Sequence, residues 1–213
     1  MIVFLVILFT LGAYGFGIYD KNRKVGNIVR IICDILLVVS LALVVMNDTQ
    51  HFGMAQKTVT KTTAIESVSP NKQAPMLLYN KVGTKSNNKV YVYQNADDTK
   101  PSHTNPEYTT NSVKRTNGKT KLVSQKKYWT YKSKFNKFMF GVARNDNQWI
   151  STHNTFYIGN NWFVLSSGQA KKLQKLMKNP QMQAKMGQAM MQNPKATPAQ
   201  KQQMLNKLLA NVK

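Results

Sequence analysis

The chain has few acidic residues and almost no cysteine. Its 213 residues include 30 Lys and Arg but only 8 Asp and Glu, so the formal net charge is +22 and anionic partners are expected. The single cysteine, Cys33, lies inside an apolar run and is expected to pack as an apolar side chain. Without a second cysteine no intrachain disulfide can form, so the fold must be held together by packing.

The sequence also lacks the short motifs of common catalytic sites. It contains no Gly-x-Ser-x-Gly, no His-Glu-x-x-His, no phosphate-cradling glycine loop and no cysteine nucleophile. Of the three histidines, only His103 has a close proton-transfer partner, Glu107, and that pair falls in a polar loop. We therefore expect a protein that is not an enzyme, with no catalytic residues, no metal site and no cofactor.

Two long apolar runs open the chain. They extend over residues 2–19 and 26–46 and are separated by a basic turn, Asp20-Lys21-Asn22-Arg23-Lys24. Each run approaches the roughly 20 residues that a helix needs to cross a bilayer. No cationic segment precedes the first run and Phe16-Gly17-Ile18 is a poor cleavage site, so we expect a retained transmembrane hairpin over 1–46 rather than a cleaved signal peptide.

The cations near the helix ends predict the orientation of this hairpin. Four of them cluster at the turn, whereas the far end of the second run meets no lysine before Lys57. Because short cytoplasmic loops carry the excess of Lys and Arg, the turn is expected in the cytoplasm and both termini outside. The expected location is the cell membrane, with two spanning helices.

Within the second run, Arg30 and Asp34 are one helical turn apart and are expected to form an intramembrane pair. The pair fits either a neutralised ion pair near the interface or a functional contact with a partner helix. The first run also offers small residues that allow close helix packing, against either Ser40 and Ala42 of the second run or a partner protein. These small residues are Gly12, Ala13, Gly15 and Gly17.

The sequence pattern over residues 47–166 predicts an extracytoplasmic, β-rich domain. Period-two alternation, as in Val90-Tyr91-Val92-Tyr93, is typical of strands, and Asn117-Gly118 is a strong signal for a two-residue hairpin between 112–115 and 119–123. Residues 94–111 are expected to be a polar connection. The expected fold class is membrane-anchored α+β: a transmembrane hairpin, a small, mostly antiparallel β domain, and short C-terminal helices.

Residues 167–213 form a basic tail rich in Met, Gln and Lys. Ser167, Asn179-Pro180 and the capping box Thr197-Pro198-Ala199-Gln200 predict three short helices. Two interpretations are open: the apolar sides of these helices lie on an anionic membrane surface, or they dock on the β domain. The expected anionic contacts are Lys171, Lys172, Lys175, Lys178, Lys185, Lys201 and Lys207. The methionine stripe at 182, 186, 190 and 191 fits packing better than Cu(I) binding.

Aromatic residues interleave with lysines from residue 126 onward. Such a pattern suits a basic stacking surface for single-stranded nucleic acid or sugars, but core and cross-strand packing is the better explanation for most of these rings. The candidates for aromatic recognition are Trp129, Tyr131 and Trp162.

A series of short motifs follows the two apolar runs: His51-Phe52-Gly53-Met54, the threonine-rich stretch 57–63, Trp129-Thr130-Tyr131-Lys132, Phe138-Met139-Phe140-Gly141, Asn154-Thr155-Phe156 and Gln169-Ala170-Lys171-Lys172-Leu173. In these motifs and their order the chain resembles an uncharacterised family of two-helix membrane proteins from Gram-positive bacteria, the domain of unknown function numbered forty-eight eleven. The resemblance covers roughly residues 1–178 and implies two membrane helices, an outside domain, no known activity and association with transporters.

These observations predict a non-enzymatic, membrane-anchored envelope protein whose basic outer domain contacts anionic lipid or wall polymer. The alternative is an accessory subunit of a membrane transporter, which would contact it through the helical hairpin. Nucleic acid is not an expected partner of a domain outside the cell.

Overall fold

The computed structural model describes residues 1–19, 23–69, 75–83, 88–177 and 196–210, together with positions 180, 181, 184 and 188. The chain forms two compact units. Unit 1 comprises Met1–Val59 and Lys126–Ile150, and unit 2 comprises Thr60–Gln125 and Ser151–Lys213. Each unit therefore contains stretches that are far apart in the sequence.

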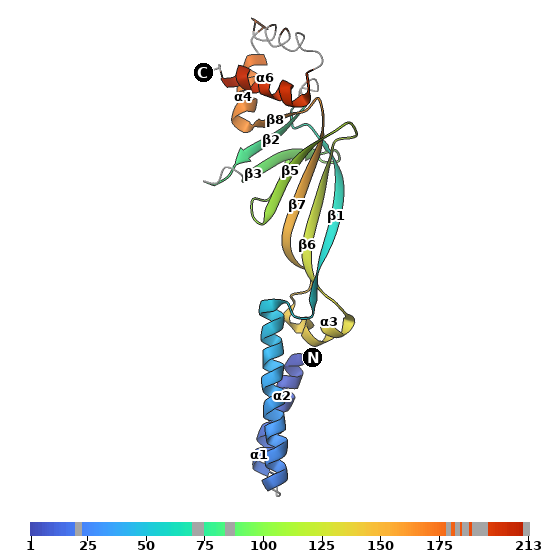
Figure 1. Ribbon diagram of the computed structural model, residues 1–213, viewed down its shortest axis with the longest axis vertical. Coiled ribbons are helices and arrows are strands. Elements are labelled where there is room, and N and C mark those ends of the chain that lie inside the picture. The colour runs from blue at the N-terminus through green and yellow to red at the C-terminus, as the bar shows by residue number, and fades with distance from the viewer. Residues whose placement is uncertain are drawn as a thin grey trace. The chain divides into compact units, whose positions relative to one another are not determined.

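The described elements combine helices at both ends of the chain with a central sheet (Figure 1). The helices are α1 (Ile2–Tyr19), α2 (Arg23–Gln50), α3 (Lys134–Phe140), the 3-10 turn η1 (Gly141–Ala143), α4 (Ser167–Met177) and α6 (Pro198–Ala210). The strands are β1 (Met54–Glu66), β2 (Met76–Lys81), β3 (Lys89–Asn95), β4 (Ser102–His103), β5 (Thr109–Thr116), β6 (Lys121–Tyr131), β7 (Gln148–Gly159) and β8 (Phe163–Ser166). The α+β class and the two N-terminal helices are confirmed.

The sheet is mixed, since it contains parallel as well as antiparallel strand pairs. Its strand order is β5-β7-β6-β1-β3-β2-β8, with β4 paired to β3. β5 runs parallel to β7, and β2 runs parallel to β8, whereas β2 and β3 are antiparallel. Both parallel pairs join strands that are not consecutive along the chain, and the period-two pattern says nothing about such partners.

The predicted hairpin at Asn117-Gly118 is wrong. The turn does link β5 to β6, but β7 lies between these two strands. The whole length of β5 pairs with β7, from Thr109 opposite Thr152 to Thr116 opposite Gly159. The Asn160 side chain also donates a hydrogen bond to Asn117. Long-range pairing thus takes the place that the local turn signal assigned to β6. The predicted polar connection over 94–111 likewise contains β4 and the start of β5.

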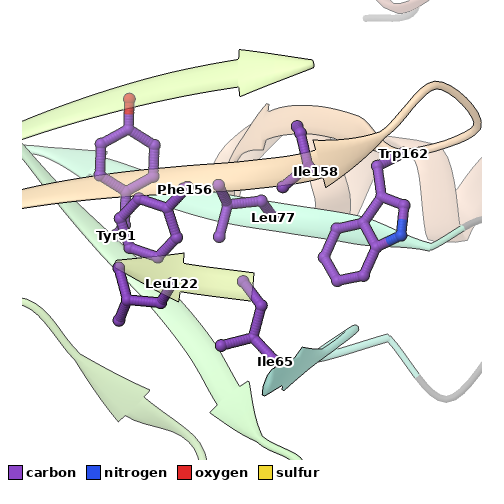
Figure 2. Close-up of a cluster of buried hydrophobic side chains, with 7 residues drawn as sticks. All are labelled: Ile65, Leu77, Tyr91, Leu122, Phe156, Ile158 and Trp162. Carbon is purple, nitrogen blue, oxygen red and sulfur yellow. The ribbon is translucent and has the colours of Figure 1, made fainter. Parts of the chain in front are cut away.

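Unit 2 is built around a cluster of buried apolar side chains (Figure 2). Leu77, Phe156 and Ile158 are fully buried, and the rings of Tyr91 and Phe156 lie 5.1 Å apart between centroids. The other members of this core are Ile65, Leu122 and Trp162. Burial of these side chains is the main source of stability, since a chain with one cysteine has no disulfide to rely on.

Buried polar side chains of unit 2 are paired with one another beside this core. The Asn154 amide donates to Asn111 at 3.0 Å, Asn111 donates to the Lys89 carbonyl at 3.0 Å, and the Tyr91 N–H donates to the Thr104 hydroxyl at 3.0 Å. Among the described residues no buried side-chain nitrogen or oxygen lacks a partner. This network therefore has a structural explanation and leaves no polar atom free for a ligand.

The apolar sides of α4 and α6 face the sheet of unit 2. Leu173 of α4 and Leu205 and Leu209 of α6 are 1–2 % exposed and form a second core with Met76 and Leu165. The structure thus selects docking on the β domain over insertion of these apolar faces into a membrane. The lysines of the same helices remain on the outside.

Side-chain caps define where these helices start. At α4, Ser166 accepts from the Gln169 N–H and Gln169 accepts from the Ser166 N–H, so the cap is Ser166 and not the predicted Ser167. The predicted capping box before α6 is confirmed by reciprocal bonds between Thr197 and Gln200. The Gln202 side chain of α6 bonds both backbone groups of Val164 in β8, at 2.9 and 3.1 Å. The middle helix of the predicted three, and the methionine stripe, fall largely outside the described residues.

Replacing Leu77 by alanine should lower the free energy of unfolding by about 2–5 kcal/mol, because a fully buried side chain is lost and a cavity is left. Denaturant unfolding of the full chain in detergent, followed by circular dichroism, measures this loss. The control is Val82→Ala, whose side chain is 38 % exposed and should change stability by no more than about 0.5 kcal/mol. Equal losses in the two variants would contradict the assignment of the core.

Candidate functional site

α1 and α2 of unit 1 expose apolar side chains over most of their length. α2 has 28 residues and is long and apolar enough to cross a membrane, while α1 is a shorter apolar helix. Side chains as large as Phe4, Leu11 and Val38 are 58–65 % exposed. Neither helix can be a buried core helix within this chain, since the described residues leave these surfaces uncovered.

The small residues of α1 are used inside the helix pair. A Cβ atom on Gly12 would lie 3.1 Å from the sulfur of Cys33, and one on Gly17 would lie 3.2 Å from Cδ of Arg30. On α2, Ser40 is buried and donates to the Leu36 carbonyl at 2.8 Å, whereas Ala42 is exposed. Of the two interpretations of the small face, the structure therefore supports packing against α2 for Gly12 and Gly17, while Gly15 faces open space.

The expected pair of Arg30 and Asp34 is present. Nε of Arg30 lies 3.7 Å from a carboxylate oxygen of Asp34, and both side chains are about half exposed. The two charges offset one another on a surface that is otherwise apolar. A pair with this exposure is open to lipid headgroups, water or a partner helix.

A cluster of polar and aromatic side chains holds the chain where it leaves α2; we call Asn47, His51, Trp129, Tyr131 and Asn145 the α2-end cluster. Asn47 is 2 % exposed, donates to the Phe52 carbonyl at 2.7 Å and accepts from Asn145 at 3.1 Å. Asn145 in turn accepts a hydrogen bond from the Tyr131 hydroxyl. The rings of His51 and Trp129 stack with centroids 4.3 Å apart.

The turn that follows α2 is clamped to the segment around α3. Gly53 has a φ of +79°, and its carbonyl accepts from both the Lys132 N–H and the Asn136 side chain, each at 3.0 Å. A Cβ on Gly53 would lie 3.3 Å from the Asn136 side chain, so glycine is required there both for its conformation and for space. The end of α2 and the start of α3 therefore form one rigid junction.

This junction gives the candidate aromatic residues structural roles. Trp129 stacks on His51, and the hydroxyl of Tyr131 is bound to Asn145. Trp162 is 8 % exposed and belongs to the core of unit 2, so its ring is not available at the surface. Trp162 is thus a core residue and not a surface contact, whereas recognition by Trp129 and Tyr131 stays a prediction. Sequence reasoning missed Asn47 and Asn145 because no local pattern marks a contact across 98 positions.

The expected anionic contacts of unit 2 lie on the outer sides of α4 and α6. Lys171, Lys172, Lys175 and Lys207 are exposed, and Lys201 is half-buried. Lys178 and Lys185 lie outside the described residues. The sequence has no acid after Asp146, so the positive charge of these helices is not neutralised by acidic residues of their own segment.

Potential metal ligands lie apart from one another in the part of the chain that the structure describes. No group of three His, Cys, Asp or Glu side chains comes together there. The burial of Tyr91 raises the pKa of its phenol, as burial does for Tyr93, so both act as neutral core residues.

A family model matches most of the chain. The model for a domain of unknown function, DUF4811, matches residues 22–173, from the turn before α2 to α4. The chain belongs to the DUF4811 family. The resemblance inferred from the short motifs is thereby confirmed, although the matched region includes neither α1 nor α6. No curated protein and no solved structure matches the chain.

In this DUF4811 protein, α3 is fixed at its two ends. The Ser133 side chain accepts from the Asn136 N–H and caps its start. The Lys137 ammonium lies 2.7 Å from Asp146 and, by donating a hydrogen bond to it, is the main reason that the pKa of Asp146 is lower than usual; backbone N–H groups of Tyr131 and Asn147 act in the same direction. Desolvation opposes this shift but does not cancel it.

The lowered pKa predicts a pH-dependent contribution to stability. Because the carboxylate is favoured in the folded state, its contribution is present above the unfolded pKa and is lost as the pH falls through the lowered folded pKa. Asp146→Asn should therefore lower the free energy of unfolding at neutral pH by less than about 1 kcal/mol, because Lys137 is exposed. The melting temperature should fall slightly. The difference from wild type should vanish in acid.

Thermal melts of both proteins in detergent across this pH range measure the effect. Lys137→Gln removes the same pair from the other side, so adding it to Asp146→Asn should cost little more than either change alone. A difference that persists unchanged in acid would show that Asp146 acts through something other than its charge.

Proposed function

We propose that this protein is a non-enzymatic, membrane-anchored protein of the cell envelope, whose basic outer domain contacts anionic lipid or wall polymer. The observation that carries the proposal is the uncovered apolar surface of α1 and α2, which needs a hydrocarbon environment. In this proposal both helices span the membrane as a hairpin, and both ends of the chain lie outside the cell.

The lengths of the helices support a two-pass anchor. At 1.5 Å per residue, the 18 residues of α1 reach about 27 Å and the 28 residues of α2 about 42 Å, against a hydrocarbon thickness of about 30 Å. The close packing of α1 on α2 through Gly12 and Gly17 matches how helices associate in lipid. α2 is long enough to extend beyond the hydrocarbon layer at its ends.

The orientation of the proposed anchor rests on charge. Arg23 and Lys24 begin α2 next to the turn, while the last turn of α2 contains no Lys or Arg. The excess of positive residues at the turn favours its cytoplasmic placement. All residues after 46 would then be outside.

The charge of the outer part supports an anionic partner. Residues 47–213 include 26 Lys and Arg and 6 Asp and Glu, a net charge of about +20. The leucines of α4 and α6 are docked on the sheet, so the lysines of these helices belong to a folded surface. Such a surface attracts polyanions through long-range fields that are screened by salt.

One observation favours a second candidate, an accessory subunit of a membrane transporter. Arg30 and Asp34 are half exposed on α2 and offer polar groups to a neighbour, while Gly15 of α1 faces open space and leaves room for a close helix. In this candidate, Asp34→Asn should weaken co-purification of a membrane partner without changing the surface charge of unit 2.

The topology predicts which positions an impermeant maleimide reaches in intact cells. In a Cys33→Ala background, Lys119→Cys in the connection after β5 should be labelled directly, because it would lie outside. Asn22→Cys in the basic turn should be labelled only after the cytoplasmic membrane is opened. The reverse pattern would overturn the orientation, and labelling of both sites in intact cells would overturn the hairpin.

The anionic contact predicts a charge-dependent affinity. Lys171→Glu with Lys175→Glu and Lys207→Glu should weaken binding of the full chain, held in neutral-lipid nanodiscs, to a poly(glycerol phosphate) wall polymer several-fold and flatten its salt dependence. The matched control replaces the same three residues by arginine, which keeps the charge and should keep the affinity. Unchanged binding by the glutamate variant would rule out these helices as the contact.

A further inference from the structure

α3 and η1 of unit 1 present an apolar surface that the rest of the described chain does not cover. Phe135 is 68 % exposed, Phe138 is 60 % exposed and Val142 is 63 % exposed. Phe135 and Phe138 are three positions apart and so share one face of the helix. The opposite face carries Phe140, which is 6 % exposed, and Asn136, which is bound to Gly53. We call Phe135, Phe138 and Val142 the α3 patch.

The junction to α2 places α3 at the end of the apolar helix pair (Figure 1). Asn136 and Lys132 both donate to the Gly53 carbonyl, three residues after α2 ends. Phe52 packs edge-on against Phe140, with ring centroids 6.2 Å apart, and is itself 45 % exposed. On the other side of the pair, the Met1 nitrogen lies 3.1 Å from the Phe138 carbonyl. α3 therefore lies beside both the end of α2 and the start of α1.

We propose that α3 and η1 lie in the interfacial layer of the outer leaflet, with the α3 patch inserted among lipid acyl chains. The inference rests on the proposed membrane anchor, because it takes the level of the bilayer surface from α1 and α2. Segments of this kind bury their apolar face about 5–10 Å into the boundary between headgroups and acyl chains. The α3 patch thus adds a second contact with lipid beside the two spanning helices.

Lipid fits this surface for two reasons. First, α3 lies beside the end of α2 and the start of α1, so the hydrocarbon phase that covers the helix pair would also reach the α3 patch. Second, exposed cations accompany the patch: Lys132 and Lys134 precede Phe135, and Arg144 follows Val142. Aromatic rings with flanking cations are typical of the headgroup level of a membrane, where the cations contact anionic phosphates.

The test uses the full chain with Cys33→Ala, reconstituted into vesicles of equal parts phosphatidylglycerol and phosphatidylcholine. A single cysteine at Ala143, which is exposed in η1 next to the α3 patch, carries an environment-sensitive nitrobenzoxadiazole probe. The same probe at Ile7 reports on the hairpin, and at Lys119 on water. Quenching by aqueous iodide and by nitroxides at shallow and deep acyl positions locates each probe.

The expected result is a blue-shifted Ala143 probe that shallow nitroxides quench more than deep ones, with iodide quenching several-fold below that at Lys119. Phe135→Ser with Phe138→Ser should return this probe to water, whereas Val82→Ser, at an exposed apolar position of unit 2, should leave it unchanged. Because both phenylalanines are exposed, a melting curve equal to that of wild type is expected and checks that the variant is folded.

Two other results would overturn the inference and are distinguishable from failure of the anchor. If the Ile7 probe is in lipid but the Ala143 probe is fully open to iodide, the α3 patch is not inserted while the anchor stands. If the Ala143 probe is shielded from both quenchers in a way that depends on protein concentration, a second copy covers the patch instead of lipid. An Ile7 probe in water would refute the anchor itself.

Discussion

The hydrogen bonds on the Gly53 carbonyl hold unit 1 together. This one oxygen accepts from the backbone of Lys132 and from the side chain of Asn136, so a residue three positions beyond α2 is tied to the residues that start α3. The left-handed conformation of Gly53 turns the chain out of α2 and into β1. The stacking of His51 on Trp129 and the packing of Phe52 on Phe140 support the same junction. The proposals about unit 1 depend on this junction.

Unit 2 must fold although its sequence is strongly basic and contains no disulfide. Two apolar cores, one within the sheet and one beneath α4 and α6, supply the cohesion that must exceed the repulsion between its lysines. The same arrangement separates the two kinds of side chain on α4 and α6, with leucines inward and lysines outward. Folding stability and a basic surface therefore come from the same two helices.

Features that depend on neighbours in the sequence could be predicted from the sequence alone. The capping box of Thr197 and Gln200 and the pair of Arg30 and Asp34 follow from spacings of three and four residues. The two apolar helices follow from long continuous apolar runs. The α+β class follows from the same local periodicities. Membership of the DUF4811 family could be inferred from short motifs spread along the chain.

Features that depend on distant partners could not be predicted. The strong Asn117-Gly118 turn signal gave no hint that β7 would separate β5 from β6, and the contact of Asn47 with Asn145 joins segments that share no pattern. Trp162 carried the same compositional signal as Trp129, yet one is in the core and the other stacks on a histidine. The docking of α4 and α6 was one of two options that amphipathic spacing leaves equal, since a leucine face fits a protein core as well as a membrane.

β8 stands last in the strand order, and the Gln202 amide of α6 satisfies both backbone groups of Val164 there. An uncapped edge strand is a template on which another chain can add a strand, and proteins commonly blunt such edges. The Gln202 side chain thus occupies the backbone groups of Val164 that a strand from another copy would need for pairing. Gln202 therefore acts against association of two copies through this edge of the sheet.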